Sequence, residues 1–91
     1  MPRRILIEFD ARPGENSSSL THRVRNLGED LFREFSDTGW ATMSLAEVDA
    51  ATDKLQLTVH RKSDLGSAMR VVKTLLKKHH FDGYSKVSDD G

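Results

Sequence analysis

The four histidines are the first candidates for chemistry, because imidazole binds metals and exchanges protons near neutral pH. Two of them, His79 and His80, stand side by side in the stretch LLKKHHFDGY. Neighbouring residues of a helix project about 100° apart, so these two side chains do not converge on one ion. Basic side chains in a last turn favour the negative end of the helix dipole. The stretch therefore predicts a helix end with no metal, His79 being partly buried and His80 more exposed. The alternative is that one of the two pairs with an acidic side chain elsewhere.

No other catalytic signature is present in the sequence. There is no Gly-x-Ser-x-Gly elbow, no Walker loop and no His-Glu-x-x-His motif. Cysteine is absent, which excludes disulfides and thiolate chemistry. The acidic residues have the spacings of solvated helix faces rather than of a buried pair. The sequence thus predicts a protein that is not an enzyme, with no catalytic residues, no cofactor and no metal.

Length and composition predict one domain over residues 1–91. The chain is 36% hydrophobic and 31% charged, which is typical of a globular protein. Fourteen Lys and Arg balance fourteen Asp and Glu, so no overall field favours nucleic acid or an acidic membrane. No apolar run approaches the roughly 18 residues of a membrane span. A cytoplasmic location is the expectation that follows.

Hydrophobic spacing predicts the elements that would position a site. Alternation over residues 3–9 indicates a strand with Ile5, Ile7 and Phe9 on one face. A helical stripe indicates a helix over residues 18–36, with Gly39 as its left-handed cap. A second helix is expected from Ser63 or Asp64 to the two histidines. The apolar stripes of the two helices comprise Leu20, Val24, Leu27, Leu31, Phe35, Leu65, Ala68, Val72, Leu75 and Leu76.

The middle of the chain indicates a hairpin. Residues 55–60 alternate cleanly, and their partner strand would be residues 43–48, joined to them by the turn DAATD. The facing of residues 43–48 stays open, because a shift of one residue exchanges the two faces of a strand. The stretch DGYSKVS can form a short last strand, and Ser88–Gly91 should be a frayed tail.

This order, β-α-β-β-α-β, predicts an α+β fold of the ferredoxin-like type. Such a sandwich has a four-stranded antiparallel sheet with two helices on one face. Right-handed crossovers would make the first and third strands parallel neighbours in the centre. Both strand-to-helix loops would then lie at one end. His22 and His60 would share that end, with His79 and His80 about 23 Å away, which excludes a four-histidine site.

That shared end is the candidate site for a small anion or a nucleotide. The loops Asp10–Ser19 and His60–Leu65 each lead into a helix N-terminus, where free N–H groups favour negative charge. Acidic residues in the same loops would neutralise much of this charge. The candidate anion-binding residues are Arg12, Ser17, Ser18, Arg61 and Lys62.

The open face of the sheet is the candidate site for a protein partner or a second copy of the chain. Either facing of residues 43–48 leaves apolar side chains beside Leu6, and such a patch suggests association. Base stacking is disfavoured there, because the central positions lack aromatic side chains. Trp40 is expected in the core, the alternative being that it covers an edge or an interface. The candidate face comprises Leu6, Glu8, Met43, Leu45, Gln56 and Thr58.

The basic face of the second helix is a third candidate surface. Arg70, Lys73 and Lys77 lie opposite the apolar stripe and could contact phosphates, although such a stripe is more often a solvated helix face. The leading expectation is a small non-enzymatic protein-interaction domain that self-associates or binds a protein through its open sheet face or an edge strand. Anion binding and weak nucleic-acid binding are the two alternatives.

Overall fold

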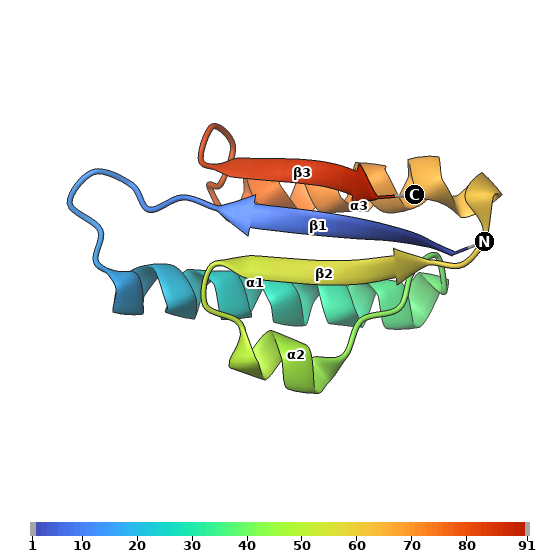
Figure 1. The fold of residues 1–91 in the computed structure, drawn as a ribbon, viewed down its shortest axis with the longest axis horizontal. Coiled ribbons are helices and arrows are strands. Elements are labelled where there is room, and N and C mark those ends of the chain that lie inside the picture. The colour runs from blue at the N-terminus through green and yellow to red at the C-terminus, as the bar shows by residue number, and fades with distance from the viewer. Residues whose placement is uncertain (1, 91) are drawn as a thin grey trace.

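A three-stranded antiparallel sheet with helices on one face forms the protein (Figure 1). The structure is a computed structural model, and it describes residues 2–90. The long helices α1 and α3 lie behind the sheet, and the short helix α2 lies beside β2. In chain order the elements are β1 (Arg3–Phe9), α1 (Ser17–Thr38), α2 (Leu45–Ala50), β2 (Lys54–Val59), the 3-10 turn η1 (Lys62–Asp64), α3 (Leu65–Lys78) and β3 (Ser85–Asp90).

The first strand occupies the centre of the sheet, whose order is β2-β1-β3. Ile5 of β1 is paired with Leu57 of β2 on one side and with Asp89 of β3 on the other. Both neighbours run antiparallel to β1, so the alternation of residues 3–9 sends Ile5, Ile7 and Phe9 into the core. The inward facing expected for these three residues is confirmed.

The prediction of a four-stranded ferredoxin-like sheet is wrong, because residues 43–48 do not form a strand. Residues 45–50 are the helix α2, and Ser44 is its N-cap. The Ser44 side chain accepts a hydrogen bond from the Glu47 backbone N–H, as in the Ser-x-x-Glu capping box. Only Thr42 of this region pairs with the sheet, through an isolated bridge to Thr58.

The direction of β2 is also the reverse of the expectation, because it is antiparallel to β1 rather than parallel. Without the extra strand, the path through α1 and α2 returns the chain to the sheet beside β1 in the opposite direction. The strand-to-helix loops therefore lie at opposite ends of the molecule. We name them the Arg12 end, where β1 finishes, and the Arg61 end, where β2 finishes.

The core lies between the sheet and the helices, and both helical stripes face it. Every stripe residue of α1 is buried, and in α3 Ala68, Val72, Leu75 and Leu76 are buried while Leu65 is half-buried. Helix α2 contributes Val48, which packs against Gly28 of α1 so closely that a Cβ at Gly28 would lie 2.7 Å from Val48 Cγ1. Trp40 is half-buried and packs against the core, which is closer to the expected core position than to the alternative of an edge or an interface.

The helix ends follow local chemistry. Gly39 ends α1 with a φ of 73°, and its N–H donates to the Phe35 carbonyl, which confirms the left-handed cap. At the end of α3 the N–H of Phe81 donates to Leu76 and that of His80 to Lys77, a Schellman motif. The stretch LLKKHHFDGY is thus a helix end, as expected. None of the helices within residues 2–90 combines the length and apolarity that crossing a bilayer requires.

The last strand is longer than expected. Ser88 pairs with Leu6 and Asp89 with Ile5, so the strand continues to Asp90. The tail was expected to fray from Ser88 onwards, but these residues form the ladder beside the central strand; Gly91 lies outside the described residues. An ion pair of 3.1 Å between Arg3 and Asp89 adds a contact at this end of the ladder.

Candidate functional site

The five candidate anion-binding residues do not form one site. Arg12, Ser17 and Ser18 lie at the Arg12 end, whereas Arg61 and Lys62 lie at the Arg61 end, because β2 runs antiparallel to β1. The two helix N-termini that were expected to meet are therefore on opposite sides of the molecule. The two-loop anion site was a consequence of the parallel arrangement and is lost with it.

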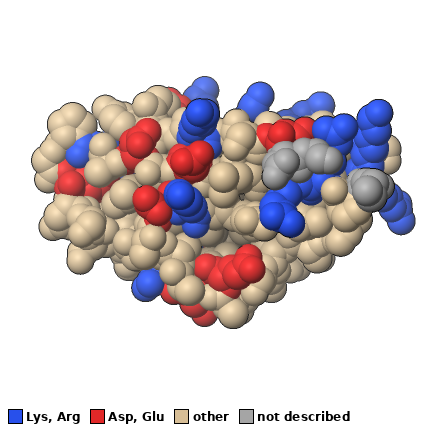
Figure 2. All heavy atoms as spheres, viewed as in Figure 1, with Lys and Arg blue, Asp and Glu red and all other residues tan. Residues whose placement is uncertain are grey.

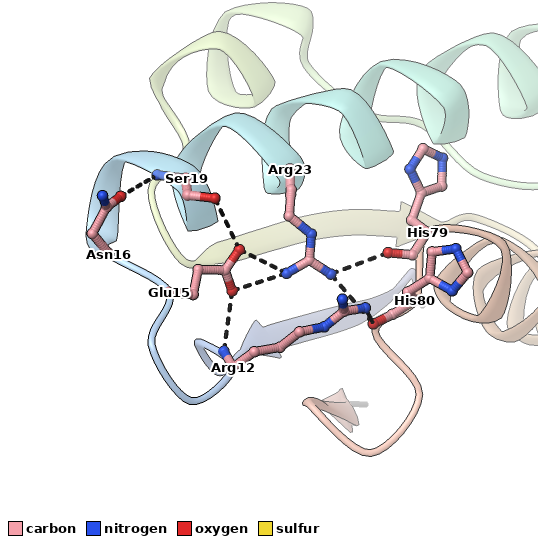
Figure 3. Close-up of polar contacts among 7 residues, drawn as sticks. All are labelled: Arg12, Glu15, Asn16, Ser19, Arg23, His79 and His80. Atoms are coloured by element: carbon pink, nitrogen blue, oxygen red, sulfur yellow. Dashed lines mark hydrogen bonds and ion pairs between the residues drawn. The ribbon is translucent and has the colours of Figure 1, made fainter.

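A different set of residues gathers at the Arg12 end, around the side chain of Arg23 (Figure 3). One terminal nitrogen of Arg23 donates to both carboxylate oxygens of Glu15 at 2.9 Å. The other donates to the backbone carbonyls of His79 at 3.1 Å and His80 at 3.3 Å. Arg12 donates to the same His80 carbonyl. The loop after β1 is thereby tied to the last turn of α3.

Glu15 is the acceptor for the remaining hydrogen bonds of this cluster. Its carboxylate accepts hydrogen bonds from the backbone N–H of Arg12 at 3.0 Å and from the Ser19 hydroxyl at 3.2 Å. The Arg12 N–H and the Arg23 guanidinium hold the pKa of Glu15 below its usual value, although partial burial opposes them. The carboxylate is therefore negative at neutral pH and is matched by Arg23.

The two arginines of the cluster also lie over aromatic rings. The guanidinium carbon of Arg23 is 4.2 Å from the centre of the Phe81 ring, and that of Arg12 is 5.8 Å from the centre of the Tyr84 ring. Arg23 directs both terminal nitrogens at protein oxygens, and its side chain is only 22% exposed. A guanidinium held in this way stabilises a loop and a helix end, and it is poorly placed to receive an anion.

Sequence reasoning missed this cluster. Glu15 was seen only as a charge that weakens an anion site, and Arg23 was not a candidate. The carbonyls that Arg23 reaches belong to residues more than 50 positions later in the chain. No local pattern encodes that contact. The signal that existed was the expectation that KKHH ends a helix, since a helix end leaves carbonyls to be satisfied.

The histidines occupy separate places. His79 Nε2 lies 2.7 Å from Oδ2 of Asp30 in α1, which is the pairing with an acidic side chain that was the alternative for this stretch. His79 is partly buried and His80 exposed, as expected. His22 is exposed on α1, and His60 contacts the Thr42 hydroxyl at the Arg61 end. Within residues 2–90 no three His, Cys, Asp or Glu side chains gather as metal ligands would.

The histidine pair nevertheless lies at the Arg12 end, which corrects the sequence argument. His79 and His80 were expected about 23 Å from the loop after β1, yet their carbonyls bind Arg23 and Arg12 directly. The reversal of β2 carries α3 in the opposite direction, so its C-terminus meets the start of α1. Of the four histidines, His60 is the one at the far end.

The open sheet face keeps four of its six expected residues. Leu6, Glu8, Gln56 and Thr58 share this face, whereas Met43 and Leu45 belong to the segment that forms α2. Lys54 and Lys86 lie across from Glu8 on either side, and Gln56 and Ser88 lie across from Leu6. Figure 2, which views the sheet side, shows Lys and Arg beside Asp and Glu. The apolar patch that suggested association through this face is absent from it.

The described surface has several shallow hollows. A hollow of about 310 Å³ at the start of α1 is lined by Ser17, Ser18, Thr21, His22 and Arg25. A larger one of about 500 Å³ lies between α1 and α2 and includes Phe32 and Leu45. Leu45 is 46% exposed and is the large hydrophobic side chain that stands out on the described surface. Neither hollow contains a buried polar side chain without a partner.

The edges of the sheet differ from one another. On the outer side of β2, Thr42 and Thr58 exchange backbone hydrogen bonds of 2.8 and 3.0 Å. On the outer side of β3, no strand within residues 2–90 is paired. Because β3 is bonded to β1 through its even-numbered residues, starting with Asp10 N–H to Tyr84 at 2.8 Å, the backbone groups of Ser85, Val87 and Asp89 point outwards. This outer side of Ser85–Asp90 is here named the β3 edge.

Searches of family models, curated proteins and solved structures find no match to this chain.

The three candidate nucleic-acid contacts lie on the helix face where the sequence predicted them. Arg70, Lys73 and Lys77 are all exposed on α3, on the side away from the core. Lys78, one residue further, lies 3.6 Å from Asp30.

Proposed function

We propose that the chain is a non-enzymatic protein-interaction domain that associates with a second copy of itself through the β3 edge. The observation that carries the proposal is the difference between the two sheet edges. β2 already shares hydrogen bonds with Thr42, whereas among the described residues β3 is paired on one side only. An unpaired edge is a template for another strand. The composition supports a cytoplasmic location for this association, because the chain has no cysteine.

The β3 edge has the regular geometry that strand addition needs. Its pairing with β1 keeps one register from Ser85 to Asp90, so no β-bulge interrupts the strand. No proline interrupts it. Outward backbone groups recur at Ser85, Val87 and Asp89, which offers three N–H groups and three carbonyls to a neighbour. Val87 is half-buried against the core, and an added strand would cover more of it.

The charges along β3 suit an antiparallel copy. If Val87 of each copy faces Val87 of the other about a two-fold axis, Lys86 faces Ser88 and Asp89 faces Ser85. No like charges then stand directly opposite each other within Ser85–Asp89. The product is a continuous six-stranded sheet with the order 2-1-3-3-1-2. Lys86 and Asp89 also make the edge unattractive to apolar strands, which favours a specific partner over aggregation.

The experiment is sedimentation equilibrium of the wild type and of Val87→Pro, from about 10 µM to about 1 mM. Proline at position 87 removes an outward N–H and leaves the hydrogen bonds to β1, which come from the even-numbered residues. We expect a concentration-dependent dimer for the wild type and a monomer for Val87→Pro. Val87→Ala is the matched control, since it removes the side chain packing and keeps the N–H, and it should still dimerise.

Two results would contradict the proposal. One is a wild type that stays monomeric over the whole concentration range. The other is a dimer that Leu6→Glu dissociates and Val87→Pro does not, because Leu6 lies on the open face and not at the edge. Circular dichroism of each variant checks that the sheet and helices are retained, so that loss of the dimer reports the interface.

A further inference from the structure

The neutral total charge of the chain conceals a strong separation of charge. Between residues 29 and 53 the chain has seven Asp or Glu and one Arg, and between residues 54 and 78 it has seven Lys or Arg and one Asp. The first segment forms the second half of α1 together with α2, and the second forms β2, η1 and α3. In Figure 2, Lys and Arg project from the upper and right-hand margins, and acidic groups gather near α2 at the lower margin.

The basic side of this separation has unpaired cations. Arg61, Lys62, Arg70, Lys73 and Lys77 are all exposed, and none forms an ion pair within the part of the chain that the structure describes. We name these five residues the α3 basic surface. At the Arg12 end, by contrast, Arg23 is held by Glu15. Two acidic residues lie near this surface: Asp64 is in η1, and Glu34 lines a hollow together with Arg70.

We propose that the α3 basic surface binds the phosphate backbone of double-helical nucleic acid without reading its sequence. Arg70, Lys73 and Lys77 follow one another at i, i+3 and i+7, which places them on one stripe about 10 Å long. Lys62 and Arg61 continue the positive charge beyond the N-terminal end of the helix. A duplex carries one charge per about 1.7 Å of its axis, so a stripe of this length faces several phosphates.

The neighbouring side chains favour a duplex over a single strand. Between the cations, α3 presents Val71 and Thr74, which neither stack on bases nor read their edges with paired hydrogen bonds. Recognition of single strands usually needs aromatic side chains on which bases stack. The aromatic side chains in the described part of the chain are all buried or half-buried. Contacts from Arg and Lys to phosphates, which are independent of sequence, are therefore the main contacts that this surface offers.

The experiment is fluorescence anisotropy with a labelled DNA duplex of about 20 base pairs and mixed sequence, from about 20 to about 200 mM salt. We expect binding at low salt, with the logarithm of the affinity falling by about 3 to 4 for each tenfold rise in salt, as for about four phosphate contacts. Lys73→Gln/Lys77→Gln should weaken binding about tenfold or more at low salt and reduce that slope by about 2. Glutamine has nearly the helix propensity of lysine, so the helix is preserved.

The matched control is Lys54→Gln/Lys86→Gln, which removes the same charge from the open sheet face on either side of Glu8. Its affinity should stay within about twofold of the wild type. Equal losses in the two double variants would show that net charge alone drives binding, and the proposal would be wrong. Absence of binding at about 20 mM salt would also overturn it. So would displacement of the duplex by polyglutamate at an equal concentration of charge, since that result would indicate an acidic protein as the partner.

Discussion

Nε2 of His79 lies 2.7 Å from Oδ2 of Asp30, and this contact joins the C-terminal end of α3 to the middle of α1. Both side chains are partly buried, with 21% and 23% of their areas exposed. The hydrogen bond from His79 holds the pKa of Asp30 below its ordinary value; partial burial opposes this, and Lys78 and Arg33 reinforce it. The Asp30 carboxylate therefore contacts three basic side chains, Arg33 of α1 and Lys78 and His79 at the end of α3.

This arrangement predicts a loss of stability in acid. Because the folded pKa of Asp30 is below its unfolded value of about 3.9, the contribution is fully present above about pH 4 and is lost as the pH falls through the folded pKa. Asp30→Asn should cost about 1 kcal/mol in unfolding free energy at pH 7. Urea unfolding at pH 7 and at values down to pH 2 gives the free energy of unfolding of the wild type and of Asp30→Asn. A difference that is the same at both pH values would contradict the assignment.

Arg23 is predicted to be irreplaceable by lysine. Arg23 uses one terminal nitrogen for Glu15 and the other for the carbonyls of His79 and His80, and the single nitrogen of a lysine cannot occupy both places. Arg23→Lys should lower the melting temperature by about 5 °C or more. Arg33→Lys on the same helix is the control, because that side chain is 74% exposed, and its effect should be within about 2 °C. Equal shifts would mean that the Arg23 contacts do not stabilise the fold.

Two helical glycines should respond to alanine in opposite directions. A Cβ at Gly28 would lie 2.7 Å from Val48 Cγ1 and 3.2 Å from Leu55 Cδ2, whereas a Cβ at Gly66 would meet nothing within 4 Å. Gly66→Ala should stabilise the protein by about 0.5–1 kcal/mol through helix propensity. Gly28→Ala should destabilise it by about 1–3 kcal/mol, because α2 must move away.

The Gly28 effect has an internal check. Adding Val48→Ala to Gly28→Ala opens the space that the new methyl group needs, so the double variant should lose less than the sum of the two single losses. Additive losses in denaturant unfolding would show that Val48 and Gly28 are not in contact, and the docking of α2 on α1 would need revision.

His80 holds a backbone conformation that favours glycine. Its φ is 62°, and its side chain is exposed at the end of the Schellman motif. His80→Gly should raise the unfolding free energy by about 1 kcal/mol, whereas His80→Ala should not raise it. Guanidinium unfolding midpoints compare the three proteins. Stabilisation by alanine equal to that by glycine would exclude backbone strain as the cause.

Patterns carried by consecutive residues were predictable from the sequence. The alternation of Ile5, Ile7 and Phe9, the stripe from Leu20 to Phe35 and the cap at Gly39 all depend on neighbours within a few positions, and the structure has them as expected. The segment after Trp40 was misread because its apolar residues, Met43, Leu45, Ala46 and Val48, are compatible with either facing of a strand. Ser44 and Glu47 carried a capping signal that favours a helix, and it outweighs the weak alternation of residues 43–48.

The candidate sites depended on strand direction, which no local pattern encodes. Once residues 43–48 were taken as a strand, β2 was oriented parallel to β1, and Arg61 and Lys62 were placed beside Arg12. The observed antiparallel pairing of Arg3 with Val59 separates these groups and brings His79 to the loop after β1 instead. By contrast, Arg70, Lys73 and Lys77 keep their place on one exposed face, because helical spacing alone determines it.

The central position of β1 also has a consequence for biosynthesis. Residues 3–9 are translated before residues 54–59 and 85–90, the two segments with which they pair. Ile5, Ile7 and Phe9 therefore have no strand to pair with until much later residues are translated. Contacts between residues so far apart in sequence give a high contact order, which is associated with slow folding. β1 therefore has two unpaired edges until β2 is made and one until β3 is made, and an apolar strand with an unpaired edge is prone to aggregate.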